Sequence, residues 1–287
     1  MNDYLNHVRS LSDLHNLIER DLTSGTEEAT KRLFDDVKAV TEKISKNADE
    51  IVSRVYAETE AAVVRLTAEA ERGIEEIKKD AAKAAADLVR DAKGGGGSKE
   101  DARTADKILK DAENATAELN QKARLALEAL SKLSEETAFK FQRITEAAIR
   151  ELADVEKGAV KKVADAGKNA AAKFPTSAKD GSKDNEALQK AKLAAAEVIK
   201  ALAQAADEVN RATAQANEKI QKASDEAILT IKKASKKVSA MINQAIDDAN
   251  EKIFRTTRTA IKAVVGEEKA EFFDLTPLKE RWTKRKP

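Results

Sequence analysis

Apolar residues recur every eleven positions along three long stretches of this chain, and this spacing constrains the fold more than any other feature. In residues 27–93 the clearest row comprises Leu33, Ile44, Val55, Leu66, Ile77 and Leu88. In residues 99–173 it comprises Ile108, Leu119, Leu130, Phe141, Leu152 and Val163, and in residues 186–265 it comprises Val198, Val209, Ile220, Ile231, Ile242, Ile253 and Val264. Eleven residues make three turns at about 3.67 residues per turn, so each row stays on one face of a nearly straight or weakly right-handed helix. The sequence therefore predicts three long helices, with Leu66, Leu130 and Ile231 buried near the middle of their rows.

The composition agrees with long helices and argues against a sheet. Aromatic residues are only 3% of the chain and charged residues are 36%, which is typical of coiled coils and leaves too few strand-forming residues. The 52 basic side chains nearly cancel the 51 acidic ones, so the net charge gives no general attraction to nucleic acid or to membranes. The chain has no cysteine, no signal-peptide pattern and no run of 18 apolar residues, so we expect a cytoplasmic protein without disulfides.

Turn-forming residues divide the chain. Residues 94–98 read Gly-Gly-Gly-Gly-Ser, which is the unit of laboratory flexible linkers, and we interpret them as an engineered junction. Residues 174–185 are rich in Pro, Gly, Ser and Asn and are predicted to form a loop. A third break is predicted at Thr23–Thr26, where Thr26 would cap the helix 27–93 and end a short N-terminal helix at residues 1–22. Gly266 is the predicted stop of the last helix, before a C-terminal segment at 267–287.

The short linker limits the topology. A helix of about 67 residues is roughly 100 Å long, whereas five linker residues span at most about 18 Å. The second helix therefore cannot return to run parallel to the first. We expect an elongated antiparallel three-helix bundle with up-down-up connections. The alternative is an open chain whose helices pair with other copies.

The sequence offers little material for catalysis or for a metal site. His7 and His15, the two histidines, are eight residues apart and too widely separated on a helix to share one metal ion. Phosphate-binding, zinc-protease, calcium-binding and serine-nucleophile motifs are absent from the sequence. The many carboxylates alternate with Lys and Arg, as expected of a solvated helix surface. We therefore expect no enzyme activity, no cofactor, no metal and no small-molecule substrate.

One basic cluster stands out near the middle of the third helix. Its members are Lys232, Lys233, Lys236 and Lys237, whose spacing places them on one side of the helix. One interpretation is a contact with an anionic partner such as phospholipid headgroups or nucleic acid. The other is an ordinary solvated helix surface, which the balanced charge of the whole chain favours.

The C-terminal segment departs from the eleven-residue pattern and concentrates aromatic residues. Its candidate contact residues are Phe272, Phe273, Leu275, Leu278 and Trp282. Thr276 and Pro277 are typical of a helix start, and such a turn would align Leu278 with Trp282. These residues are expected either to fold back and cap an end of the bundle, against the N-terminal helix, or to anchor a partner protein.

The helices resemble three families in their alanine-rich repeats. Residues 68–72 and 80–86 look like peripheral-stalk subunits of rotary ATPases, which form long, weakly right-handed coiled coils. The stretch 194–206 is similar to granule-coating phasins and to eleven-repeat, apolipoprotein-like lipid-surface proteins. The function expected from the sequence is a non-catalytic rod that scaffolds or spaces partners and contacts another protein through a bundle face or the C-terminal segment. The alternative is an amphipathic protein of lipid or granule surfaces, and nucleic acid is not an expected partner.

Overall fold

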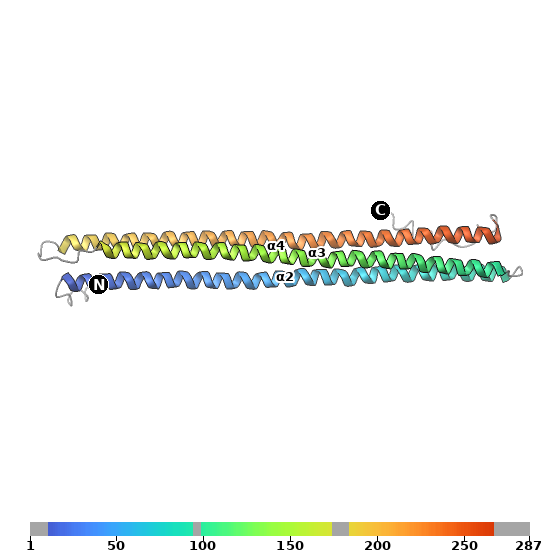
Figure 1. Cartoon of the computed structure of the whole chain (residues 1–287), viewed down its shortest axis with the longest axis horizontal. Helices are drawn as coiled ribbons and strands as arrows, with labels where there is room; N and C mark the ends of the chain where they lie inside the picture. The colour runs from blue at the N-terminus through green and yellow to red at the C-terminus, as the bar shows by residue number, and fades with distance from the viewer. Residues whose placement is uncertain (1–10, 94–98, 174–183, 267–287) are drawn as a thin grey trace. The chain divides into compact units, whose positions relative to one another are not determined.

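Three long α-helices make up the part of the chain that the structure describes. The computed structural model describes residues 11–93, 99–173 and 184–266, and no strand occurs within these ranges. Helix α2 spans Leu11–Lys93, α3 spans Lys99–Ala172 and α4 spans Asp184–Val265 (Figure 1). Their buried faces pack against one another, so the prediction of an all-α fold with three long helices is confirmed.

The predicted break at Thr23–Thr26 is wrong, because α2 continues through it without interruption. Thr26 is buried, and its methyl carbon would lie 3.1 Å from a Cβ placed on Gly167 of α3. It therefore occupies a packing position, eleven residues before Val37, and does not cap a helix. Gly25 costs a helix about 1 kcal/mol relative to alanine, which the packing of the adjacent Thr26 against α3 offsets. The expected short helix at 1–22 is thus replaced by the first turns of α2, and residues 1–10 lie outside the described residues.

The chain divides into two compact units, each of which contains a segment of all three helices. Unit 1 consists of residues 1–52 and 139–226, and unit 2 consists of residues 53–138 and 227–287. The core of unit 1 contains Val37, Ile44, Phe141, Leu152, Val163, Val209 and Ile220. All of these side chains except Val37 belong to the eleven-residue rows, so the sequence pattern corresponds to the buried face of each helix in this unit.

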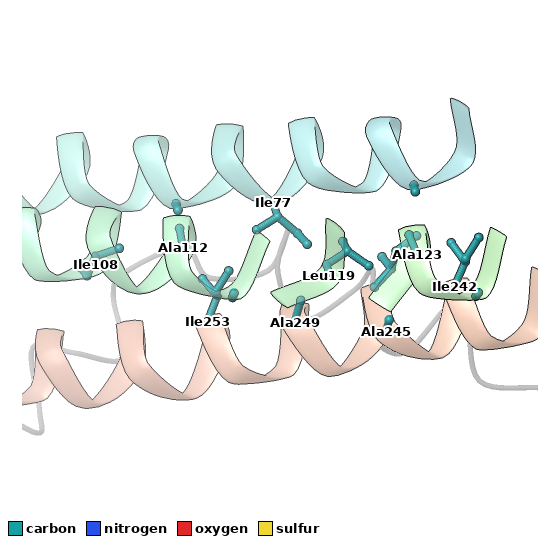
Figure 2. Close-up of a cluster of buried hydrophobic side chains, with 14 of the residues drawn as sticks. Ile77, Ile108, Ala112, Leu119, Ala123, Ile242, Ala245, Ala249 and Ile253 are labelled. Carbon is teal, nitrogen blue, oxygen red and sulfur yellow. The ribbon is translucent and has the colours of Figure 1, made fainter. Parts of the chain in front are cut away.

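The core of unit 2 is built from the same rows. Figure 2 shows Ile77 of α2, Leu119 of α3 and Ile253 of α4 among the apolar side chains that gather where the three helices meet. Leu66, Leu130 and Ile231, which the sequence predicts to be buried, are 0%, 1% and 2% exposed. Burial of a side chain of this size contributes about 1.5–3 kcal/mol, so a charge at any of these positions would be strongly destabilising.

Three exposed ion pairs between α3 and α4 of unit 1 repeat with the same spacing. The pairs are Glu151 with Lys219, Lys162 with Glu208, and Lys173 with Glu197. Residue numbers rise by eleven along α3 while they fall by eleven along α4, so the two segments run in opposite directions within this unit. In unit 2 the pairs with the same sense are Glu118 with Lys252 and Lys122 with Asp248. Exposed pairs contribute only about 0.2–1 kcal/mol each, so they report the register more than they stabilise it.

Thr59 has a larger role than its sequence position suggests. Thr59 and Thr137 lie beside the main apolar rows of their helices, and the sequence pattern predicts that both tolerate replacement by alanine. Thr59, however, is buried, and its Oγ1 is 2.9 Å from the Val55 carbonyl oxygen and 2.9 Å from Ser134 Oγ of α3. Ser134 is only 1% exposed, so the expectation is corrected for Thr59: its loss would remove a hydrogen-bond partner from a buried hydroxyl.

Gly73 and Ile246 form a close contact between α2 and α4 in unit 2. A Cβ placed on Gly73 would lie 2.7 Å from Ile246 Cδ1 and 2.8 Å from its Cγ1. Ile246 is 1% exposed and has little room to move aside. The absence of a side chain at Gly73 therefore allows Ile246 to pack directly against the α2 backbone.

The Gly73→Ala variant should lower the free energy of unfolding by about 1–3 kcal/mol, because the cost of overpacking exceeds the helix-propensity gain of about 1 kcal/mol. Urea unfolding followed by circular dichroism measures the change. Adding Ile246→Val, which removes Cδ1, should restore part of the loss.

Gly158→Ala in α3 provides the matched control. Nothing lies within 4 Å of a Cβ placed on Gly158, so this variant should gain stability by about 0.5–1 kcal/mol. A gain of similar size for Gly73→Ala would contradict the close contact with Ile246.

Candidate functional site: grooves on unit 2

The basic cluster predicted from the sequence lies on the surface of α4 in unit 2. Lys232, Lys233, Lys236 and Lys237 are all exposed. None of the four forms an ion pair with another residue in the described parts of the chain. Their charges are therefore not neutralised by a direct partner within the described helices.

Three of these lysines line a groove between α2 and α4. The groove has a volume of about 590 Å³ and is bordered by Lys232, Lys233 and Lys236 on α4 and by Glu58 and Arg65 on α2. Arg65 donates a hydrogen bond from Nη2 to Ser235 Oγ over 3.3 Å, which holds its guanidinium group along the groove. Four basic side chains and one carboxylate give this groove a net positive charge.

The lining residues contributed by α2 were not predicted. Arg65 precedes the core residue Leu66 in the sequence, and nothing in the pattern of one helix shows which other helix it faces. The contact depends on the register between α2 and α4, which becomes visible only when the helices are packed. Leu229, which is 51% exposed, adds an apolar side chain to the same groove.

Lys237 borders a different groove, between α3 and α4 of unit 2. This groove has a volume of about 830 Å³, and its wall is mostly apolar. Leu125 and Met241 lie on it and are 52% and 51% exposed, and Leu133, Val238 and several alanines also line it. The ion pair of Lys122 with Asp248 also borders the groove, so an apolar surface with a polar rim is available here.

A third groove lies between α2 and α3 of unit 2 and is more polar. It has a volume of about 520 Å³, and its lining includes Val63, Ile74 and Leu127. Charged side chains surround these residues, namely Glu71, Arg124, Glu128, Lys132 and Glu135. The mixed charges give it no preference for one sign of ligand.

Two carboxyl groups among the described residues have a pKa shifted from its usual value. Partial burial raises the pKa of the Glu156 carboxyl above its usual value. A hydrogen bond from Lys222, with its positive charge, lowers the pKa of Glu218. Neither carboxyl lines one of the three grooves. No cluster of three or more potential metal ligands occurs among the described residues.

The remaining predicted site residues cannot be placed. Phe272, Phe273, Leu275, Leu278 and Trp282 lie outside the described residues, as do His7 and the side chain of His15. The proposals made for them from the sequence therefore stay predictions. No described helix has a stretch apolar enough to cross a membrane.

Comparisons with known proteins do not assign the chain to a family. No protein-family model matches it, and no curated protein matches it.

Proposed function

We propose that this chain is a non-catalytic structural or interaction protein, an elongated rod that spaces or scaffolds its partners. The observation that carries the proposal is that the eleven-residue rows are buried in both units, on all three helices. The apolar stripes thus cover one another within one chain. A protein whose stripes are already covered has no need of a lipid surface or of other copies to bury them.

The topology that we propose for the rod is up-down-up. The ion pairs of α3 with α4 have an antiparallel sense in each unit. In unit 2, Arg65 contacts Ser235 and Gly73 contacts Ile246, so residue numbers rise together along α2 and α4. Helices with this register, joined by short connections, would form a stiff antiparallel bundle.

The proposed partner is another protein that binds a bundle face. The α3–α4 groove of unit 2 supports this proposal, because Leu125 and Met241 expose apolar surface there beside a polar rim. The aromatic residues of the C-terminal segment are the alternative contact that the sequence predicts, in place of folding back on the chain itself.

Small-angle scattering tests the rod. Helix α4 has 82 residues, which correspond to about 120 Å at 1.5 Å per residue. We expect a maximum dimension of at least about 120 Å and a radius of gyration of about 35 Å, independent of protein concentration. A compact chain of 287 residues would have a radius of gyration of about 19 Å, and such a value would contradict the proposal.

A second candidate function is binding to an anionic lipid surface. The specific observation that favours it is the basic cluster, whose charges have no direct partner within the described helices, with Leu229 exposed beside it. Basic side chains attract anionic headgroups, and an apolar neighbour could enter the interface.

Flotation with vesicles rich in phosphatidylserine separates the two functions. For a rod, we expect the protein to stay in the unbound fraction. If it floats, replacing the four lysines of the cluster with glutamine should abolish flotation. Replacing Lys78, Lys79, Lys107 and Lys110, which are also exposed, is the control with the same change in charge. Flotation lost only in the first variant would favour the lipid-surface function over the rod.

A further inference from the structure

Helices α2 and α4 of unit 2 meet along a line that we call the α2–α4 seam. Side chains at the outer edge of this seam are unusually buried at one end of unit 2. On α2, Glu58 and Glu69 are half-buried, whereas Asp80, at the next equivalent position, is only 7% exposed. On α4, Ile228 and Ser239 are half-buried, whereas Asn250, at the next equivalent position, is only 3% exposed. Positions eleven residues apart have the same orientation, so their exposure should be similar if the same helices surround them. Additional cover is therefore present around Asp80 and Asn250.

The buried edge contains polar atoms that the described helices do not satisfy. Asn250 Oδ1 and Thr257 Oγ1 are buried and have no hydrogen-bond partner among the described residues. Other buried threonines in the described helices, such as Thr116 and Thr145, donate to a backbone carbonyl of their own helix. Buried polar atoms are almost always hydrogen-bonded, so these two point to a neighbouring segment that supplies donors.

Asp80, Asn250 and Thr257 belong to one surface. Gly73 and Ile246 mark the contact between α2 and α4. Asp80 follows Gly73 by seven residues, and Asn250 and Thr257 follow Ile246 by four and eleven residues, which correspond to nearly whole numbers of turns. All three side chains therefore lie along the seam that Gly73 and Ile246 begin, and all belong to unit 2.

The C-terminal segment is the part of unit 2 that can cover this seam. Outside its described helices, unit 2 contains only residues 94–98 and 267–287. Four of the five residues 94–98 are glycine, so they have almost no side chains with which to cover a surface. Gly266 ends α4 with φ +79° and donates to the Lys262 carbonyl over 3.1 Å, so the chain turns away from the helix axis here. The 21 residues from 267 to 287 span about 30 Å even as a helix, and Asn250 lies sixteen residues, or about 24 Å, before Gly266.

The chemistry of the segment fits the seam. Asp80 on α2 contributes a carboxylate to this surface, and so does Asp247 on α4, which lies eleven residues after Lys236 of the α2–α4 groove. The segment carries the basic residues Lys279, Arg281, Lys284, Arg285 and Lys286. Basic side chains can donate to these carboxylates and to the oxygens of Asn250 and Thr257. The segment also supplies the apolar cover, through Phe272, Phe273, Leu275, Leu278 and Trp282.

We propose that residues 267–287 fold back and dock on the α2–α4 seam of unit 2, between Asp80 and Thr257. The aromatic residues cover the seam, and the basic residues face its carboxylates. The surface is thus a binding site for the chain's own C-terminal segment, whichever function the grooves serve.

The single tryptophan allows a direct test in the full-length protein. Trp282 belongs to the segment and is the only tryptophan in the chain. Docking should shift its fluorescence emission to shorter wavelength and make quenching by acrylamide several-fold weaker than in the urea-unfolded protein. Equal quenching in the native and the unfolded protein would overturn the proposal without any variant.

A matched pair of variants tests the position of the docked segment. Asp80→Lys should increase quenching of Trp282 several-fold, because it places a positive charge opposite the basic segment. Glu69→Lys makes the same charge change one repeat earlier on α2 and should leave quenching unchanged. Circular dichroism checks that both variants keep the helix content of the parent. If the two variants behave alike, the segment docks elsewhere and the proposal is wrong.

Dilution distinguishes docking within one chain from exchange between two copies. For docking within one chain, the emission and the quenching of Trp282 should not change with protein concentration. Quenching that increases on dilution would show that a second copy supplies the segment, which would also overturn the proposal.

Discussion

The eleven-residue spacing of apolar side chains is the constraint on which the rest of the structure depends. At about 3.67 residues per turn this spacing nearly matches a straight helix, so a buried row stays on one face over many turns. Leu66 and Ile77 on α2, and Ile231 and Ile242 on α4, are buried for this reason. A heptad spacing would instead wind the helices around one another in a left-handed supercoil. Three ion pairs between α3 and α4 of unit 1 repeat with the same period, because the polar flanks of the rows have the same geometry.

Small side chains set the distance between the helices and the composition of their seams. Alanine occupies many core positions, which allows the helices to approach closely. At Gly73 there is no side chain, so Ile246 packs directly against the backbone of α2. Close approach of the helices buries little apolar area per residue. Some positions at the contacts between helices are occupied by buried polar side chains. Thr59 with Ser134 forms one satisfied polar contact of this kind, whereas Asn250 and Thr257 lack a described partner. The seams therefore combine apolar rows with a few polar positions at which specificity and binding can arise.

The sequence predicts which face of each helix is buried, because this follows from the periodicity of one helix. The structure adds the register between helices, which depends on how they pack in pairs. The rows around Leu130 and the exposed face of Lys232 follow from periodicity along one helix, and the structure agrees with both. The predicted break before residue 27 is wrong because the turn signal at Gly25 is weaker than the packing of Thr26 against α3. Arg65, as part of the basic groove, could not be predicted, because its position there depends on the register of α2 against α4.

The most direct test of the helix register is chemical cross-linking between introduced cysteines. The chain contains no cysteine of its own, so each introduced pair is unambiguous. Lys162→Cys combined with Glu208→Cys should be linked within one chain by a short bifunctional thiol reagent, because the parent side chains form an ion pair at 2.7 Å. Lys162→Cys combined with Lys219→Cys is displaced by eleven residues, or about 16 Å, and should not be linked. Efficient linkage of the displaced pair, or linkage only between separate chains, would contradict the packing of α3 against α4 described for unit 1.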